Sequence, residues 1–199
     1  MLKLFRRFLL LFLAVLMFGF INESTHSIND FSLKNIDGQM VSLSQFKDAK
    51  GFIIVFTCNH CPFAKLYPER LNQLNLKYKA LGVPLIAISS TDTIMYVEDT
   101  YPKMVKKAKK EKFNFPYLFD GEQTVAKDFS AQKTPHAYVV WKENSKWIIK
   151  YDGAIDDNGN SPEKVSKQYV ADAVDSLLSN KPVAVSQTKS IGCQILFRK

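Results

Sequence analysis

Cysteine and histidine are scarce in this chain, with only three residues of each among 199. Three cysteines are too few for the disulfide framework of a small secreted domain, so the fold must depend on a hydrophobic core. A zinc site built on Cys58 and Cys61 would need two further ligands at compact spacing. The remaining candidates, Cys193, His26 and His136, lie far away in the sequence, which disfavours a zinc knuckle.

Long hydrophobic runs are missing as well. The longest apolar stretch, residues 8–21, would span about 21 Å as a helix, whereas the hydrocarbon core of a bilayer is roughly 30 Å thick. Lys3, Arg6 and Arg7 precede it, and a basic start before an apolar segment is the pattern of a secretory signal. We therefore expect residues 1–21 to be a signal peptide or a retained N-terminal membrane anchor. The rest of the chain would be extracytoplasmic, either periplasmic or secreted.

The sequence contains no internal repeat, low-complexity tract or sign of a second folded domain. Its length fits one domain with a well-buried core, which we place at residues 28–179. Residues 180–199 form a C-terminal tail to which the sequence assigns no structure.

The formal net charge of +8 points to no nucleic-acid partner, because no basic stripe interleaved with aromatic residues accompanies it. Six lysines crowd into residues 103–112, within a helix expected over residues 93–112. We interpret them as a solvated helix face, with a docking patch for an acidic partner as the alternative.

The most informative stretch is residues 52–61. The apolar run Phe52–Phe56 ends in Cys58-Asn-His-Cys61, and apolar residues at helical spacing follow. Such a strand would deliver Cys58 to the start of a helix, where free N–H groups and the helix dipole favour a thiolate. A Cys-x-x-Cys pair between a strand and a helix predicts a redox-active disulfide. An inert disulfide is the structural alternative, although so short a loop gains little from closure.

Other patterns predict alternating strands and helices. Val83–Ile88 is a second continuous apolar run, typical of a parallel sheet that is covered on both faces. Around these runs we expect a hairpin flanking Ile36–Gln39, a helix that Pro68 kinks or restarts, a short strand at 115–119, a short helix at 123–129, a hairpin over 136–152 and a last helix that starts near Ser161.

Several segments carry a resemblance to a known family, namely Phe31–Gly38, Val41–Phe46, Thr57–Pro62, Lys133–His136 and Tyr151–Gly153. The chain resembles the redoxin group (alkyl hydroperoxide reductase/thiol-specific antioxidant-like), which includes exported thiol-disulfide oxidoreductases. The resemblance implies an α/β, thioredoxin-like fold with a central mixed β-sheet flanked by helices and an N-terminal hairpin extension.

The resemblance also assigns roles around the cysteines. Pro135 matches the cis-proline that faces the disulfide, and Thr134 matches the residue whose backbone pairs with a substrate chain. His60 is expected to donate a hydrogen bond or positive charge to the Cys58 thiolate, which would make the disulfide more oxidising. The alternative is an exposed histidine without that effect.

Two departures from the family pattern limit these expectations. Many thioredoxins place a buried acid in the strand below the cysteines as a proton acceptor, but residues 52–56 contain none. Peroxidatic redoxins carry Pro and Thr seven and three residues before their cysteine, where this chain has Gly51 and Val55. Peroxide chemistry is therefore not supported by the sequence.

We predict a thiol-disulfide oxidoreductase that uses a reversible Cys58–Cys61 disulfide to exchange electrons with protein thiols or disulfides and an unidentified electron donor or acceptor. No cofactor and no resident metal are expected. A copper-binding thioredoxin-fold chaperone using Cys58, Cys61 and His136 is the alternative, because thiolate and imidazole suit Cu(I). A peroxiredoxin-type antioxidant peroxidase ranks lower. Cys193 is expected to be buried or simply exposed, with a relay to the cysteine pair as the alternative.

Overall fold

The computed structural model describes residues 26–198, so the segment interpreted as a signal or anchor lies outside the described residues. No helix within 26–198 combines the length and the apolar character needed to cross a membrane. The strands are β1 (Ser27–Ile28), β2 (Ser32–Asn35), β3 (Met40–Ser42), β4 (Gly51–Phe56), β5 (Leu85–Ser89), β6 (Tyr117–Phe119), β7 (Lys133–Thr134), β8 (His136–Glu143), β9 (Lys146–Gly153) and β10 (Cys193–Gln194). The α-helices are α2 (Pro68–Tyr78), α3 (Tyr101–Lys110), α4 (Thr124–Asp128) and α5 (Tyr169–Leu178).

The main sheet is mixed and has the strand order β1-β9-β8-β4-β5-β6-β2-β3. β4 pairs in parallel with β5, and β5 with β6, whereas β8 and β9 pair antiparallel beside β4. β7 and β10 form a separate two-stranded sheet. This is the expected thioredoxin-like α/β fold, and the β2–β3 hairpin is its N-terminal extension.

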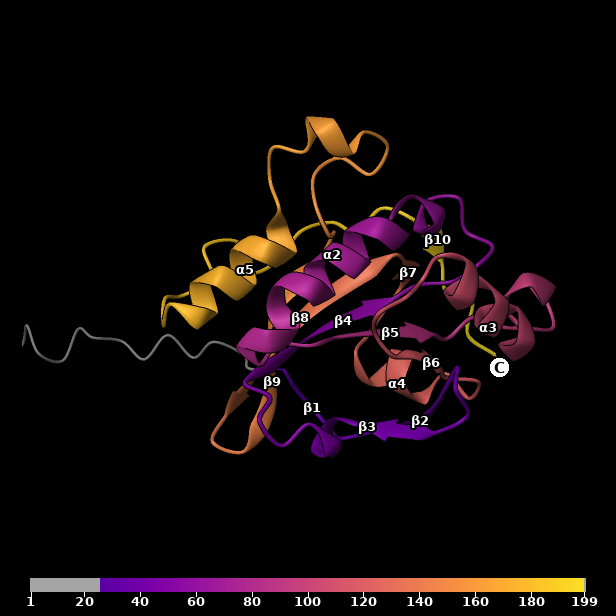
Figure 1. Cartoon of the computed structure of the whole chain (residues 1–199), viewed down its shortest axis with the longest axis horizontal. Coiled ribbons are helices and arrows are strands. Elements are labelled where there is room, and N and C mark those ends of the chain that lie inside the picture. Colours follow the sequence, from indigo (N-terminus) through magenta and orange to yellow (C-terminus); the bar gives the residue numbers. More distant parts are fainter. Residues whose placement is uncertain (1–25, 199) are drawn as a thin grey trace, which may run out of the picture.

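Both faces of the sheet are covered, which explains the continuous apolar runs in β4 and β5 (Figure 1). Ile53 and Val55 of β4 face a core that α2, α3 and α5 share. Phe52, Ile54 and Phe56 face the opposite core, to which α4 contributes. Because successive strand residues point to opposite faces, a strand buried on both sides must be apolar at every position.

The long helices begin later than the sequence predicted. After the cysteines comes only a 3₁₀ turn, Ala64–Leu66, and the regular helix α2 starts at Pro68. α3 starts at Tyr101 rather than near residue 93, and a 3₁₀ turn at Val97–Asp99 precedes it. Proline lies in the first turn of both helices, where its missing N–H leaves no hydrogen bond unmade. The pattern at Ser161 likewise yields a single 3₁₀ turn, and α5 follows at Tyr169.

Candidate redox site

The cysteine pair lies beyond the end of β4, against the β7 residue Thr134. Both cysteines are fully buried free thiols in this structure. The Cys58 Sγ lies 3.1 Å from the Thr134 Oγ1, and the Cys61 thiol is 3.0 Å from the Thr134 carbonyl oxygen. The Thr134–Pro135 peptide bond is cis, as the resemblance implied. The structure thus brings Cys58, Cys61, Thr134 and Pro135 together, and His60, the fifth predicted site residue, lies beside Cys58.

Local hydrogen bonds, not a helix dipole, set the ionisation of the pair. The expectation that Cys58 begins a helix is wrong, because nine residues lie between it and Pro68, the first residue of α2. The Cys61 sulfur accepts hydrogen bonds from the Cys58 thiol, the Cys193 thiol and the backbone N–H groups of Ala64 and Cys193, which lower the pKa of Cys61 to about 4. The hydrogen bond between the Cys58 thiol and the Cys61 sulfur raises the pKa of Cys58, and burial and the negative charge of Asp99 raise it further. These contacts favour a thiolate on Cys61 over one on Cys58, whereas the hydrogen bond to the Thr134 carbonyl oxygen is made by Cys61 in its thiol form.

His60, the fifth predicted residue, is held by a carboxylate. Its Nδ1 lies 2.5 Å from the Asp99 Oδ2, and its ring stacks on Tyr96 with centroids 3.9 Å apart. The other Asp99 oxygen accepts the backbone N–H groups of Asn59 and His60. One nitrogen of His60, the Cys58 sulfur and an Asp99 oxygen lie within 4.8 Å of one another. The imidazole is therefore close enough to pass a proton to or from Cys58 or Asp99.

Asp99 is the buried acid that the sequence reasoning did not find. It is 0 % exposed and comes from the 3₁₀ turn before α3, instead of from the strand below the cysteines. A carboxylate beside Cys58 disfavours a thiolate there and can accept a proton when Cys58 reacts. No local pattern marked it, because the turn lies in a stretch expected to be helical.

Lys107 is the exception in the lysine cluster, whose other five members are exposed as a solvated face requires. Its Nζ donates a hydrogen bond of 2.8 Å to the Cys58 carbonyl oxygen, and burial lowers the pKa of its ammonium group. The side chain therefore points into the site instead of belonging to a solvated face. Helical spacing carried a usable signal, since Met104 and Ala108, three residues before and one after, are buried.

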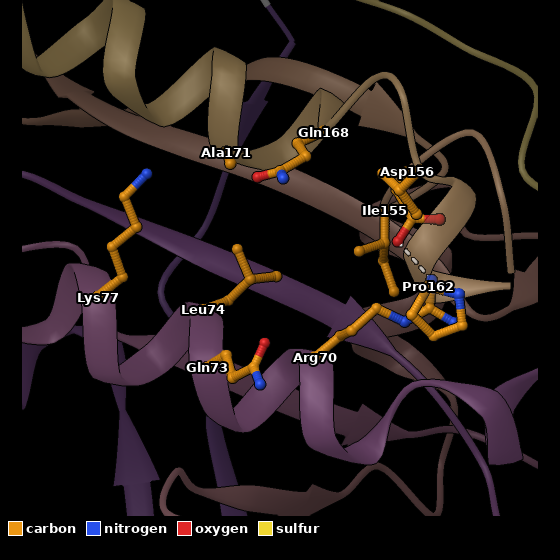
Figure 2. A pocket seen from close by; sticks show the side chains of 10 residues that line it. Arg70, Gln73, Leu74, Lys77, Ile155, Asp156, Pro162, Gln168 and Ala171 are labelled. Atoms are coloured by element: carbon orange, nitrogen blue, oxygen red, sulfur yellow. Dashed lines mark hydrogen bonds and ion pairs between the residues drawn. The ribbon is translucent and has the colours of Figure 1, made fainter.

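A cavity of about 270 Å³ opens beside Pro135, lined by Phe63, Pro135, Ile191 and the loop from Ala154 to Asn160; no cysteine lines it. Phe63 and Ile191 are exposed apolar side chains on its rim. Arg70 of α2 holds the loop, because its guanidinium contacts the Asp156 carboxylate at 2.7 Å and donates to the carbonyl oxygens of Asn158 and Gly159. Figure 2 shows this ion pair at one end of a second pocket, between α2 and α5, which contains none of the cysteines.

His136 does not join the cysteines. Its Nε2 contacts the Asp152 carboxylate, and its Nδ1 lies 3.4 Å from the backbone nitrogen of Gln132 and 3.3 Å from the hydroxyl of Tyr138. Among the described residues, the one compact group of three candidate metal ligands is Cys58, His60 and Asp99. The three-residue copper set of the alternative interpretation is therefore not assembled here.

The C-terminal tail returns to the site. Cys193 and Gln194 in β10 pair antiparallel with Thr134 and Lys133 in β7. The Cys193 N–H points to the Cys61 sulfur at 3.4 Å, and the Cys193 side chain packs against the cluster formed by the other two cysteines. The relay alternative thus has the geometry that the sequence alone did not favour.

A family model described as "AhpC/TSA family" matches residues 25–158, which is more than half of the chain. The chain belongs to the AhpC/TSA family. This membership and the thioredoxin-fold neighbours make the protein a redox enzyme with a redoxin fold.

Two solved structures are similar over most of their length. An uncharacterized conserved protein from Geobacillus kaustophilus is 36% identical, with a TM-score of 0.79 over 87% of this chain and 92% of that chain. A hypothetical protein from Sinorhizobium meliloti 1021 is 31% identical, with the same TM-score over 87% and 94%. A putative thiol:disulfide interchange protein DsbE from Chlorobium tepidum shares the fold at 18% identity, with a TM-score of 0.59 over 77% and 96%.

The curated relatives match only in part. A probable glutathione peroxidase 2 from Arabidopsis thaliana is 38% identical over 66 residues, which are 33% of this chain and 38% of that protein. The matching segment thus spans well under half of the relative, and its peroxidase activity is a statement about that protein.

Proposed function

We propose that this AhpC/TSA-family protein is a thiol-disulfide oxidoreductase that exchanges electrons with protein thiols or disulfides through a reversible Cys58–Cys61 disulfide. The observation that carries the proposal is the placement of both sulfurs on Thr134, one on its hydroxyl and one on its carbonyl oxygen. The Cys58 thiol donates a hydrogen bond to Cys61 and so favours a thiolate there. This prepares the pair for exchange, because a thiolate is the species that attacks a disulfide.

The surroundings support protein substrates. The cavity beside Pro135 carries exposed apolar side chains, Phe63 and Ile191, on its rim. Such a surface suits an extended polypeptide with an apolar residue near its cysteine, whereas a small peroxide needs no cavity of about 270 Å³. The DsbE-like neighbour, named as a thiol:disulfide interchange protein, is consistent with this substrate class.

A peroxidase is the second candidate, because the curated relatives are named as glutathione peroxidases and another fold neighbour as a peroxidoxin. Against it stand Gly51 and Val55, at the positions where peroxidatic redoxins carry Pro and Thr.

For localisation, we propose export from the cytoplasm with residues 1–21 as signal or anchor, on the basic-then-apolar pattern alone. Fractionation of cells that produce the full chain, with detection of a C-terminal tag, tests this assignment. Recovery of the tagged protein in the cytoplasmic fraction would contradict it.

The function is tested by equilibrating the protein with glutathione redox buffers and following the Cys58–Cys61 bond by peptide mass spectrometry. We expect a reversible disulfide, reduction or oxidation of a model protein substrate, and loss of both in Cys58→Ser/Cys61→Ser. Consumption of hydrogen peroxide faster than exchange with the protein substrate would instead favour the peroxidase. A pair that stays reduced in every buffer would overturn the proposed activity.

A further inference from the structure

The tail strand β10 occupies the edge at which a substrate is expected to pair. Cys193 lies opposite Thr134 in an antiparallel register, and its N–H points to the Cys61 sulfur. A cysteine in a substrate strand paired to this edge would lie in the same place. The tail therefore presents Cys193 to the pair as a substrate would present its own cysteine.

The position is fixed on both sides of Cys193. On one side the Thr188 hydroxyl accepts the Ala154 N–H at 2.9 Å and lies 2.6 Å from the Tyr151 hydroxyl. On the other side the Ile195 side chain is buried in the sheet core, and its N–H donates to the Gln132 carbonyl oxygen at 2.8 Å. Such a held strand keeps its thiol at a high effective concentration beside the pair.

Gly192 makes the close approach feasible. A Cβ atom at this position would meet the Thr134 carbonyl oxygen at 2.0 Å and the Pro135 nitrogen at 3.1 Å. Because those are backbone atoms, any larger residue would push β10 off the edge. The chain thus has glycine at the position where the tail passes over Thr134 and Pro135, the residues that face the cysteines.

A relay requires the third cysteine to be more exposed than the pair, and the three cysteines differ in this way. Cys58 and Cys61 are 0 % exposed, whereas Cys193 is only partly buried. An external protein disulfide therefore meets Cys193 before it can reach the pair while the tail is in place.

We propose that Cys193 is a third redox cysteine of this site, which relays a disulfide between external proteins and the Cys58–Cys61 pair. The inference rests on the proposed function, because it supplies the route by which that same pair reaches its substrates.

The steps balance in the reducing direction. The Cys193 thiol loses its proton and attacks an external protein disulfide, so that a mixed disulfide forms and one substrate thiolate leaves and takes up that proton. The Cys61 thiolate attacks the Cys193 sulfur, so that a Cys61–Cys193 bond forms and the second substrate sulfur leaves as a thiolate with the electron pair and takes a proton from solvent. Cys58 then loses its proton and attacks the Cys61 sulfur, and Cys193 leaves as a thiolate that takes up that proton. The Cys58–Cys61 pair has lost two electrons and the external disulfide has gained them, while Cys193 is unchanged.

The central step is tested in Cys58→Ser, which cannot form the final bond. Oxidation of the full chain with diamide should give an intramolecular Cys61–Cys193 disulfide, identified by mass spectrometry of linked peptides. Adding Gly192→Ala should slow formation of this bond by about tenfold or more, because a displacement of about 1 Å can cost that much. Gln194→Ala, at an exposed neighbour in β10, is the matched control and should leave the rate unchanged.

Activity supplies the second readout. Cys193→Ser should retain the Cys58–Cys61 disulfide but exchange with a protein substrate about tenfold or more slowly, since proximity of the relay thiol is lost. Free Cys61 and Cys193 in oxidised Cys58→Ser, or faster exchange in Cys193→Ser, would overturn the relay and leave the tail as a cover. Absence of a Cys58–Cys61 disulfide in the wild type would instead contradict the proposed function, so the two failures are distinguishable.

Discussion

Asp99 offers the most direct test of how the site controls its thiols. Its carboxylate is 0 % exposed and has an oxygen within 4.8 Å of the Cys58 sulfur. At that separation and an effective dielectric constant of about 20, two unit negative charges repel by about 3.5 kcal/mol, which corresponds to about 2.5 pKa units. Lys107, whose ammonium group binds the Cys58 carbonyl oxygen, offsets part of this repulsion. We therefore expect Asp99→Asn to lower the pKa of Cys58 by about one to two units.

The measurement needs a protein with a single thiol. In Cys61→Ser/Cys193→Ser, Cys58 is the one remaining cysteine, so thiolate absorbance near 240 nm against pH reports its pKa alone. Asparagine removes the charge and keeps an oxygen for the backbone N–H groups of Asn59 and His60, while its NH₂ group replaces the oxygen that contacts the His60 Nδ1. The substitution is then added to this background and the titration is repeated.

Glu98→Gln is the matched control, because Glu98 is the adjacent acid on the same turn and its side chain is exposed. It should shift the Cys58 pKa by a few tenths of a unit at most, since water screens its charge. Equal titration curves with and without Asp99→Asn would refute the assignment of Asp99 as the charge that acts on Cys58.

Three further outcomes are expected. In the wild-type dithiol, thiolate absorbance should persist at neutral pH and disappear only as the pH falls through about 4, the lowered pKa of Cys61; Cys61→Ser should abolish this low-pH transition. Arg70→Ala should lower the free energy of unfolding by about 3 kcal/mol in denaturant titrations, because its ion pair is largely buried, whereas Lys77→Ala, at an exposed pair, should cost less than about 1 kcal/mol. His60→Phe, which keeps the stacked ring but removes the nitrogen that contacts Asp99, should raise the pKa of Cys58 in the Cys61→Ser/Cys193→Ser background, because nothing then offsets the Asp99 charge; an unchanged pKa would make His60 a structural residue.

The sequence predicted the parts of the fold whose signal is local. The two continuous apolar runs predicted β4 and β5, because a strand that is covered on both faces has no position that favours a polar residue. The turn at Asn144-Ser145 gave the hairpin of β8 and β9, and both residues adopt positive φ there. The cis bond before Pro135 came from the resemblance, since Thr-Pro alone is compatible with either isomer.

The charged part of the site could not be predicted in this way. Asp99 comes from a turn about forty residues after the cysteines, and only the packing of α3 brings it beneath them. The two-residue pairing of β10 with β7 is also long-range, and strands this short have no detectable period. Sequence reasoning therefore found the thiols and missed the groups that decide which of them is ionised.

The groups around the two cysteines shift their pKa values in opposite directions. On the Cys58 side, the carboxylate of Asp99 disfavours a negative charge. On the Cys61 side, hydrogen bonds from backbone N–H groups and two thiols favour it. The sulfur on which a negative charge is favoured is consequently the one that contacts the tail, and it is buried, as the Cys58 sulfur also is. A site arranged this way reacts first with whatever strand lies on β7, which in this structure is the strand that carries Cys193.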